Sequence, residues 1–340
     1  MKKCITYLFG AGASCKTLPI LREMPGAMAN QMDFLNNKEG FLRPDIISAT
    51  KETKSNEEIE YLKDLSWLKA NCQEHASVDT FARKLYINGE SEKLLILKNC
   101  LSAFLLIEQL KKQVDVRYDT FFANVLESKY KMPDKLKIIS WNYDMQFEMS
   151  YQAFVNERTL ENAQAILGVY MKYNDNWRAN GKFGIYKLNG SSIAYHADNS
   201  RRQVIYASLD HRKISPEILQ DIFNSYCIMK TDASKYISGL SFAWERGSYN
   251  NSFYTDILTL AKKHTIDTEV LVIIGYSIPF FNREIDREII GEMSNLKKVY
   301  FQDLEPNGLI ERFTSIRDDI EKSNLIPIKN CDQFFIPNEM

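Results

Sequence analysis

The sequence predicts an α/β protein with a Rossmann-like parallel sheet, helices on both faces of the sheet and a helical insertion. Three observations lead to this fold class. Short runs of apolar, β-forming residues recur along the chain, longer segments with helical spacing separate them, and the first run ends in a turn of very small residues. Strands that alternate with helices favour a parallel sheet, because each connection between parallel strands must cross over the sheet.

The composition fits a large intracellular protein with a proper core. Of its 340 residues 45% are hydrophobic, and 43 Lys and Arg residues nearly balance 44 Asp and Glu residues. This balance gives no reason to expect direct binding of nucleic acid. Six cysteines without a C-x-x-C pair predict neither a disulfide framework nor a metal site. No signal peptide and no run near the ~18 apolar residues of a membrane span are found. We therefore expect a cytoplasmic protein that binds neither a membrane nor a metal.

The first element is a strand followed by a glycine turn. Residues 3–9 are β-formers without a charge after Lys3, and Gly10-Ala11-Gly12-Ala13-Ser14 follows them. Residues this small let a ligand approach the backbone, and a helix after the turn would aim its free amides at an anion. The turn therefore predicts a phosphate-binding site, with a structural turn that binds nothing as the alternative.

Two nucleotide-binding motifs match part of this turn. Gly10 and Gly12 supply the first two glycines of the dinucleotide motif G-x-G-x-x-G, but Cys15 stands at the third position. The P-loop motif G-x-x-x-x-G-K-[ST] also fits, with Lys16 and Thr17 in place and again Cys15 instead of glycine. A P-loop also needs a later strand that ends in an acidic residue to hold magnesium, and the most apolar later strand does not.

Residues 61–128 are predicted to be helical. Ser77 or Asp79 is the candidate cap of one helix. A broad apolar stripe at helical spacing follows, formed by Leu94, Leu97, Leu101, Phe104, Leu105, Ile107 and Leu110. We interpret the stripe as core of the molecule, with an interface to another subunit as the alternative.

Three later strands end in polar residues. They are followed by Trp141-Asn142-Tyr143-Asp144, by Asn189-Gly190-Ser191-Ser192 and by Gly275-Tyr276-Ser277. Open α/β sheets bind ligands at the carboxyl ends of their strands, so Asn142 and Asp144 are well placed to bind a ribose. The alternative is that one of them only caps the next helix.

Two further strands complete the sheet in this prediction. Residues 298–301 end at Gln302-Asp303, and an aspartate at such a place can bind ribose hydroxyls. Gln203–Ala207 is a further candidate strand, which either pairs with residues 184–188 as a hairpin or leads into the next helix.

Four of these motifs together resemble the SIR2-like family, in the bacterial branch found in anti-phage defence. They are Gly10–Ser14, Trp141–Asp144, Lys187–Ser191 and Ile274–Ser277, each after a predicted strand, and the resemblance spans residues 3 to about 303. The family implies an NAD-binding Rossmann-like core with a helical insertion, and cleavage of the bond between nicotinamide and ribose. In defence proteins, the implied outcome is NAD hydrolysis, which starves an infected cell.

The resemblance also implies roles for single residues. Asn142 would hold the reacting ribose and the attacking water, and Asp144 would support Asn142. The glycine turn would hold the pyrophosphate, and the residues from Gly275 would line the adenosine side. The implied NAD-binding residues are Gly10, Ala11, Gly12, Ala13, Ser14, Gly190, Ser191, Gly275, Tyr276, Ser277 and Asp303.

Asn189 departs from the family pattern. The family has histidine there, in a Lys-Leu-His-Gly sequence, as the base toward a ribose hydroxyl. Asparagine cannot take up a proton, although it can still orient a substrate. Nicotinamide leaves without being protonated, so the loss of a base, worth about 10² to 10⁴ in rate, is compatible with a slower enzyme. His196 is a candidate substitute base.

Two hypotheses about function follow. The first is an NAD⁺ glycohydrolase that uses NAD⁺ as substrate and is gated by self-assembly or by a sensor protein from a neighbouring gene. The second is a catalytically silent subunit that binds NAD or ADP-ribose. Either would form one domain over residues 1–340, with residues 1–35 and 130–330 as the core and residues 40–128 as the helical insertion.

Overall fold

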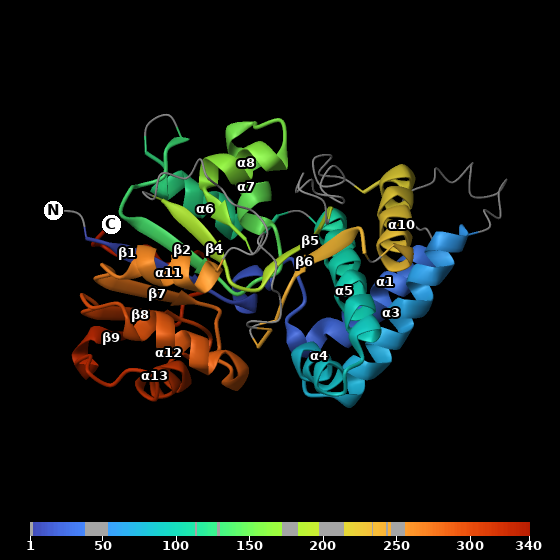
Figure 1. Cartoon of the computed structure of the whole chain (residues 1–340). Coiled ribbons are helices and arrows are strands. Elements are labelled where there is room, and N and C mark those ends of the chain that lie inside the picture. Colours follow the sequence, from blue (N-terminus) through green and yellow to red (C-terminus); the bar gives the residue numbers. More distant parts are fainter. Residues whose placement is uncertain are drawn as a thin grey trace. The chain divides into compact units, whose positions relative to one another are not determined.

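The protein divides into two compact units, seen in the computed structural model of Figure 1. The first unit contains residues 1–16, 114–191 and 241–340, and the second contains residues 17–113 and 192–240. The structure describes residues 3–37, 54–112, 114–127, 130–171, 183–196, 214–232, 234–242, 244–245 and 256–340. The candidate strand Gln203–Ala207 and the first residues of the expected insertion, 40–53, lie outside the described residues.

The first unit is built on a parallel sheet of seven strands, which confirms the predicted α/β fold class. The order across the sheet is β3-β4-β2-β1-β7-β8-β9, and every described pairing in it is parallel. The strands are β1 (Ile5–Phe9), β2 (Leu136–Ser140), β3 (Val169–Tyr170), β4 (Gly184–Lys187), β7 (Val270–Ile274), β8 (Lys298–Gln302) and β9 (Leu325–Ile328). The sequence pattern predicted all of these strands except β3 and β9.

The register of the central strands ends β1, β2 and β7 at the same level, so the three loops that follow them begin side by side. Phe9, the last residue of β1, pairs with Ser140 of β2 on one side and with Ile274 of β7 on the other. The chain leaves β1 toward β2 and later returns to the other side of β1 with β7. This reversal of direction is the place where open α/β sheets bind ligands.

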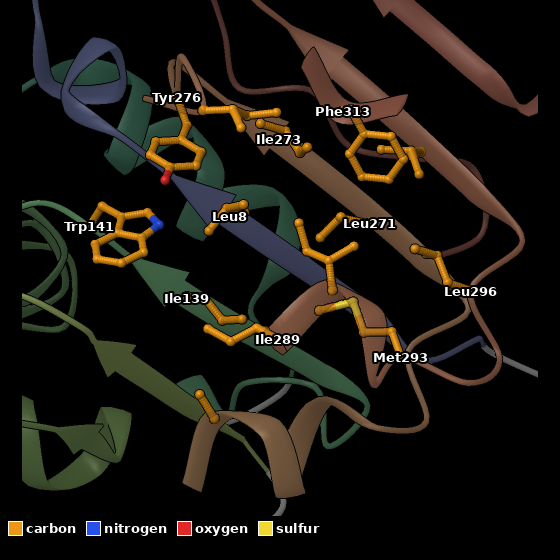
Figure 2. Packing of buried hydrophobic residues seen from close by; sticks show 14 of the residues in the cluster. Leu8, Ile139, Trp141, Leu271, Ile273, Tyr276, Ile289, Met293, Leu296 and Phe313 are labelled. Atoms are coloured by element: carbon orange, nitrogen blue, oxygen red, sulfur yellow. The ribbon is translucent and has the colours of Figure 1, made fainter. Parts of the chain in front are cut away.

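Helices cover both faces of the sheet. Alternate residues of a strand point to opposite faces, so Leu8 belongs to one face and Tyr7 and Phe9 to the other. On the face of Leu8, apolar side chains of α11 (Ile257–Thr265), α12 (Arg283–Gly291) and α13 (Pro306–Thr314) form a buried cluster with Leu271 and Ile273 (Figure 2).

The opposite face is packed with aromatic rings. The ring of Phe9 lies 6.3 Å from Phe121 of α6 (Val116–Val125) and 4.9 Å from Phe147 of α7 (Gln146–Val155). Helix α8 (Leu160–Leu167) packs against α7 and leads into β3. The first unit also contains two short 3-10 helices, η4 (Phe280–Asn282) and η5 (Lys322–Asn324), besides η1 (Ala11–Ser14) at the glycine turn.

The second unit is mainly helical. It contains η2 (Leu21–Glu23), α1 (Met24–Asn37), α3 (Asn56–Glu74), α4 (Val78–Ile87), α5 (Ser91–Lys111), α10 (Pro216–Thr231) and β6 (Tyr236–Leu240), which pairs with β5 (Gly190–His196). Ser77 caps α4, because its hydroxyl accepts the amide of Thr80 at 3.2 Å. The apolar stripe of α5 packs against α3, α4 and α10 and is at most 8% exposed, which confirms it as core.

The division into units differs from the expected division into core and insertion. Helix α6 lies on the sheet of the first unit, although we expected it in the insertion. Helices α1 and α10 pack against α3 in the second unit, although we expected them in the core. Helical spacing shows which face of a helix is apolar, but it does not show which neighbour covers that face.

None of the described helices has both the length and the apolar character needed to cross a membrane.

Candidate functional site

The glycine turn packs its backbone directly against the end of β7. The amide of Gly10 donates to the carbonyl of Ile274 at 3.0 Å, and the amide of Gly12 donates to the carbonyl of Gly275 at 2.8 Å. A Cβ atom on Gly12 would lie 2.8 Å from the Cα of Gly275, too close for any side chain. The glycines are therefore needed where two strand ends meet, a structural role that the motif alone does not reveal.

The turn offers few amides to a phosphate. The amide of Ala13 donates to the carbonyl of Gly10 at 2.9 Å, so it is used inside η1. In the described part of the chain, the exposed Ala11 makes no backbone hydrogen bond through its amide. No α-helix begins at the turn, because η1 is a single 3-10 turn and α1 begins only at Met24. The row of helix amides that both nucleotide motifs require is absent here.

Replacing Gly275 by alanine is expected to lower the free energy of unfolding by at least about 2 kcal/mol. Gly275 has a φ of 56°, and its Cβ would lie 2.7 Å from the Cα of Gly12 and closer still to other backbone atoms of the turn. Chemical denaturation measures the loss. Gly308→Ala in α13 is the matched control, because nothing lies within 4 Å of that Cβ. Equal stability of both variants would contradict the packing of Gly275 against the turn.

Polar side chains from the ends of β1 and β2 form one buried cluster in the first unit. The amide Nδ2 of Asn142 donates to the hydroxyl of Ser14 at 3.4 Å, and this hydroxyl lies 2.8 Å from the hydroxyl of Tyr118. The Ser14 hydroxyl also lies close enough to the carboxyl group of Asp144 to act against the rise of its pKa. The three residues predicted in these two loops therefore meet, and Asn142 faces the glycine turn with only 7% of its surface exposed.

Asp144 is a buried carboxyl group in this cluster that also contacts the start of α7. Its Oδ1 accepts the amide of Gln146, the first residue of α7, at 3.1 Å, although the capping position of α7 is Met145 and not Asp144, as the alternative interpretation had it. Burial raises the pKa of the Asp144 carboxyl above its ordinary value, while the charge of Lys187 acts in the opposite direction. A carboxylate with a raised pKa is a better proton acceptor than an exposed one, which is useful if it receives a proton from a ligand.

A buried ion pair lies behind the loop that carries Asp144. The ammonium group of Lys187 lies 2.7 Å from Oε1 of Glu148 and also donates to the backbone carbonyl of Asp144. Both side chains are almost completely buried, and Gln164 donates to the same carboxylate at 3.3 Å. The pair therefore connects β4, α7 and the end of the Asp144 loop.

Asn189 has a buried hydrogen-bond acceptor for which the described residues provide no partner. Its Nδ2 donates to the carbonyl of Trp141 at 3.1 Å, whereas its Oδ1 makes no hydrogen bond to any described residue. The side chain is 5% exposed, and leaving such an acceptor unpaired costs about 1–3 kcal/mol. Nδ2 uses one of its two N–H groups on Trp141, whereas Oδ1 is unused, so Asn189 offers a ligand an acceptor that suits a hydroxyl group.

Gly190 and Ser191 lie at the start of strand β5 rather than in a loop. Gly190 has a φ of 70°, which a side chain rarely adopts, and Ser191 donates to the carbonyl of Tyr143 at 3.3 Å. They therefore fix the Asn142 loop from its other side. His196 ends the same strand and packs against Tyr236, whose strand belongs to the second unit, so it is not grouped with the cluster of the first unit.

Among the described residues, no hydrogen bond joins the cluster to Tyr276 or Ser277 of the predicted adenosine side, or to Asp303, the predicted ribose contact. The ring of Tyr276 is buried and its hydroxyl donates to Asp286 at 2.6 Å. Ser277 is exposed, and its carbonyl accepts a hydrogen bond from Arg312 at 2.6 Å. Asp303 accepts the amide of Glu305 at 2.9 Å and so stabilises the turn after β8.

Arg117 and Tyr118 belong to the site but carry no sequence signal. Arg117 is paired with Asp115 and donates to the carbonyl of Ala13 at 2.8 Å, so it supports the glycine turn from α6. A lone arginine and a tyrosine at the start of a helix are typical of many solvated helix ends. Only the packing of α6 on the sheet shows that both are buried.

The described residues contain no group of three or more His, Cys, Asp or Glu residues arranged to hold a metal ion. No model of a known protein family matches the chain, and no curated protein sequence matches it. Fold and geometry together define an α/β protein with a Rossmann-like parallel sheet and a buried polar cluster at the carboxyl ends of its strands.

Proposed function

We propose that the protein is an NAD⁺ glycohydrolase of the SIR2-like type, which cleaves NAD⁺ to nicotinamide and ADP-ribose. One observation carries the proposal: Ser14, Asn142 and Asp144, from loops far apart in the sequence, lie in one buried polar cluster beside the glycine turn, where Asn142 donates a hydrogen bond to Ser14. Its place at the carboxyl ends of β1 and β2, where the strand order reverses, is the ligand-binding position of open α/β sheets.

The reaction can proceed with the residues at hand. The bond between C1 of the ribose and the pyridine nitrogen breaks, the electron pair stays on nicotinamide, and a water oxygen bonds to C1. In this proposal Asn142 orients the water and the ribose, and Asp144 accepts the proton that the water loses. Oδ1 of Asn189 accepts a hydrogen bond from a ribose hydroxyl. Positioning and fixed dipoles supply the acceleration, because the leaving group needs no proton.

Asn189 also predicts that the proposed enzyme cleaves NAD⁺ slowly. An amide oxygen holds the ribose hydroxyl but cannot remove its proton, so a base worth about 10² to 10⁴ in rate is missing. Slow or conditional cleavage suits an effector that starves an infected cell of NAD⁺. The proposal therefore includes a cytoplasmic protein that is gated by self-assembly or by a sensor protein from a neighbouring gene.

The direct test is to incubate the purified chain with NAD⁺, alone and with the protein of the neighbouring gene. We expect free nicotinamide and ADP-ribose in equal amounts in at least one of these mixtures, measured by chromatography. Tight NAD⁺ binding in calorimetry without nicotinamide release in any mixture would instead select the second hypothesis, a silent NAD- or ADP-ribose-binding subunit. The unpaired Oδ1 of Asn189 suits that hypothesis equally well.

The P-loop alternative has less support in the geometry. Lys16 donates to the carbonyl of Asp332 at 3.4 Å, and no helix follows Thr17 directly to complete a phosphate site. Magnesium-dependent ATP binding that disappears in Lys16→Ala would restore this alternative.

A further inference from the structure

Asp286 is a buried carboxyl group on the apolar side of α12. It is 1% exposed, and its neighbours on the helix face, Ile289 and Ile290, belong to the core cluster under the sheet. A lone carboxyl group in such surroundings is costly unless donors surround it. The groups that satisfy Asp286 come from two loops at the carboxyl edge of the sheet.

Each oxygen of Asp286 accepts a hydrogen bond from a different loop. The indole Nε1 of Trp141, at the end of β2, donates to Oδ1 at 3.1 Å. The hydroxyl of Tyr276, after β7, donates to Oδ2 at 2.6 Å. The two rings are stacked with their centroids 6.0 Å apart, and Figure 2 shows their polar atoms turned toward the same region. Asp286 therefore ties the β2 loop to the β7 loop.

Both tied residues are next to the candidate site. Trp141 precedes Asn142, and its carbonyl accepts the hydrogen bond from Asn189. Tyr276 follows Gly275, whose backbone packs against the glycine turn. A shift of either ring would therefore move Asn142, Asn189 or the turn.

The β7 loop needs such an anchor because its backbone is strained. Ile278 has a φ of 49°, a region that a β-branched residue rarely adopts. Strained backbone of this kind persists only where its surroundings hold it in place. The hydrogen bond from Tyr276 to Asp286 and the one from Arg312 to the carbonyl of Ser277 provide that hold.

We propose that Asp286 is a proton-sensitive positioning residue, whose ionised form holds the Trp141 and Tyr276 loops, and with them the proposed NAD⁺ site, more firmly than its neutral form. This inference rests on the proposed function only for the identity of the ligand. An indole N–H can only donate, so a proton on the carboxyl must sit on the oxygen that faces Tyr276. The tyrosine hydroxyl must then turn and accept, and both hydrogen bonds lose their charge assistance, which is about half of their strength.

The pKa of the Asp286 carboxyl lies near neutral pH. Burial raises the pKa of Asp286 to about 7, against the hydrogen bonds from Tyr276 and Trp141 and the charge of Arg283, which act to lower it. Arg283 lies on α12 itself, and burial keeps the pKa of Tyr276 well above its ordinary value, so the tyrosine stays neutral. From α11, Lys262 pairs with Glu288 and Glu292 of the α12 segment instead.

The first measurement follows the link itself, with tryptophan fluorescence of the full chain between about pH 5 and pH 9. We expect wild type to titrate with a midpoint at about 7 and Asp286→Asn and Trp141→Phe to lack this transition. Tyr276→Phe should move the midpoint to higher pH, because it removes a hydrogen bond that favours the ionised carboxyl. A flat wild-type signal overturns the proposal, and so does an unchanged midpoint in Tyr276→Phe. The Tyr276→Phe result decides even if Asp286→Asn does not fold.

The second measurement tests positioning, with calorimetry of NAD⁺ binding at about pH 6 and about pH 8. We expect wild type to bind several-fold more tightly at the higher pH, and Tyr276→Phe to lose most of this difference. Equal affinities in wild type at both pH values, together with a normal fluorescence titration, overturn the positioning role. If NAD⁺ does not bind at all, the proposed function fails, whereas the fluorescence titration still decides whether Asp286 links the two loops.

Discussion

Replacing Asn142 by alanine is expected to lower the rate of NAD⁺ cleavage by at least ~100-fold, because the variant removes the group that orients the ribose and the water. Among the described residues the side chain makes one long hydrogen bond, 3.4 Å to Ser14, and the loop keeps its backbone hydrogen bond to the hydroxyl of Ser140. We therefore expect little loss of stability. Release of nicotinamide is measured under the conditions in which the wild type is active.

Asn124→Ala is the matched control for this variant. Asn124 is exposed on α6 in the same unit, and within the described part of the chain its side chain bonds only to the carbonyl of Thr120, one turn earlier. Its activity should equal that of wild type. If Asn142→Ala cleaves NAD⁺ as fast as the control, the cluster around Ser14 is not the reaction site, and the proposed mechanism is wrong.

Replacing Lys187 by methionine is expected to lower the free energy of unfolding by about 3–5 kcal/mol, because it leaves the carboxylate of Glu148 buried without its cation. The double variant Lys187→Met with Glu148→Leu should be clearly more stable than Lys187→Met alone, because it removes both charges. Urea denaturation measures both values. The ion pair is 2.7 Å long and its two side chains are 2% and 0% exposed, so solvent screens it little.

The control for this prediction is Lys131→Met, which removes an exposed ion pair of the same unit. Lys131 lies 3.3 Å from Asp134, and the two side chains are 60% and 41% exposed, so solvent screens the pair and we expect a change below about 1 kcal/mol. If Lys187→Met loses no more stability than Lys131→Met, then removing the lysine does not leave a charged Glu148 buried without a partner, and the prediction is wrong.

The strands with a clear apolar pattern were predictable from the sequence. Val270–Ile274 has no polar residue and forms β7 in the middle of the sheet, covered on both faces. Strand β3 has only two residues and β9 contains a proline, so neither is long or regular enough to show a pattern. The loops after β1, β2 and β4 were recognisable because small or polar residues follow each strand directly.

The candidate site was predictable only in part. Asn142 and Asp144 lie beside Ser14, as the ligand-binding edge of a parallel sheet requires. Arg117 and Tyr118 were missed, because nothing local shows that α6 turns them toward the glycine turn. Asp286 left one sign in the sequence, a carboxyl group at helical spacing from Ile289 and Ile290, but its two partners are distant in the chain.

The sequence by itself determined the α/β class, the five patterned strands and the small and polar residues at their ends, because apolar periodicity and turn chemistry are local properties. The tertiary structure alone decided what those residues touch. It showed that Gly12 and Gly275 make room for each other, that Oδ1 of Asn189 has no partner among the described residues, and that Asp286 ties two loops. These contacts follow from the register that ends β1, β2 and β7 at one level, and register depends on how whole elements pack.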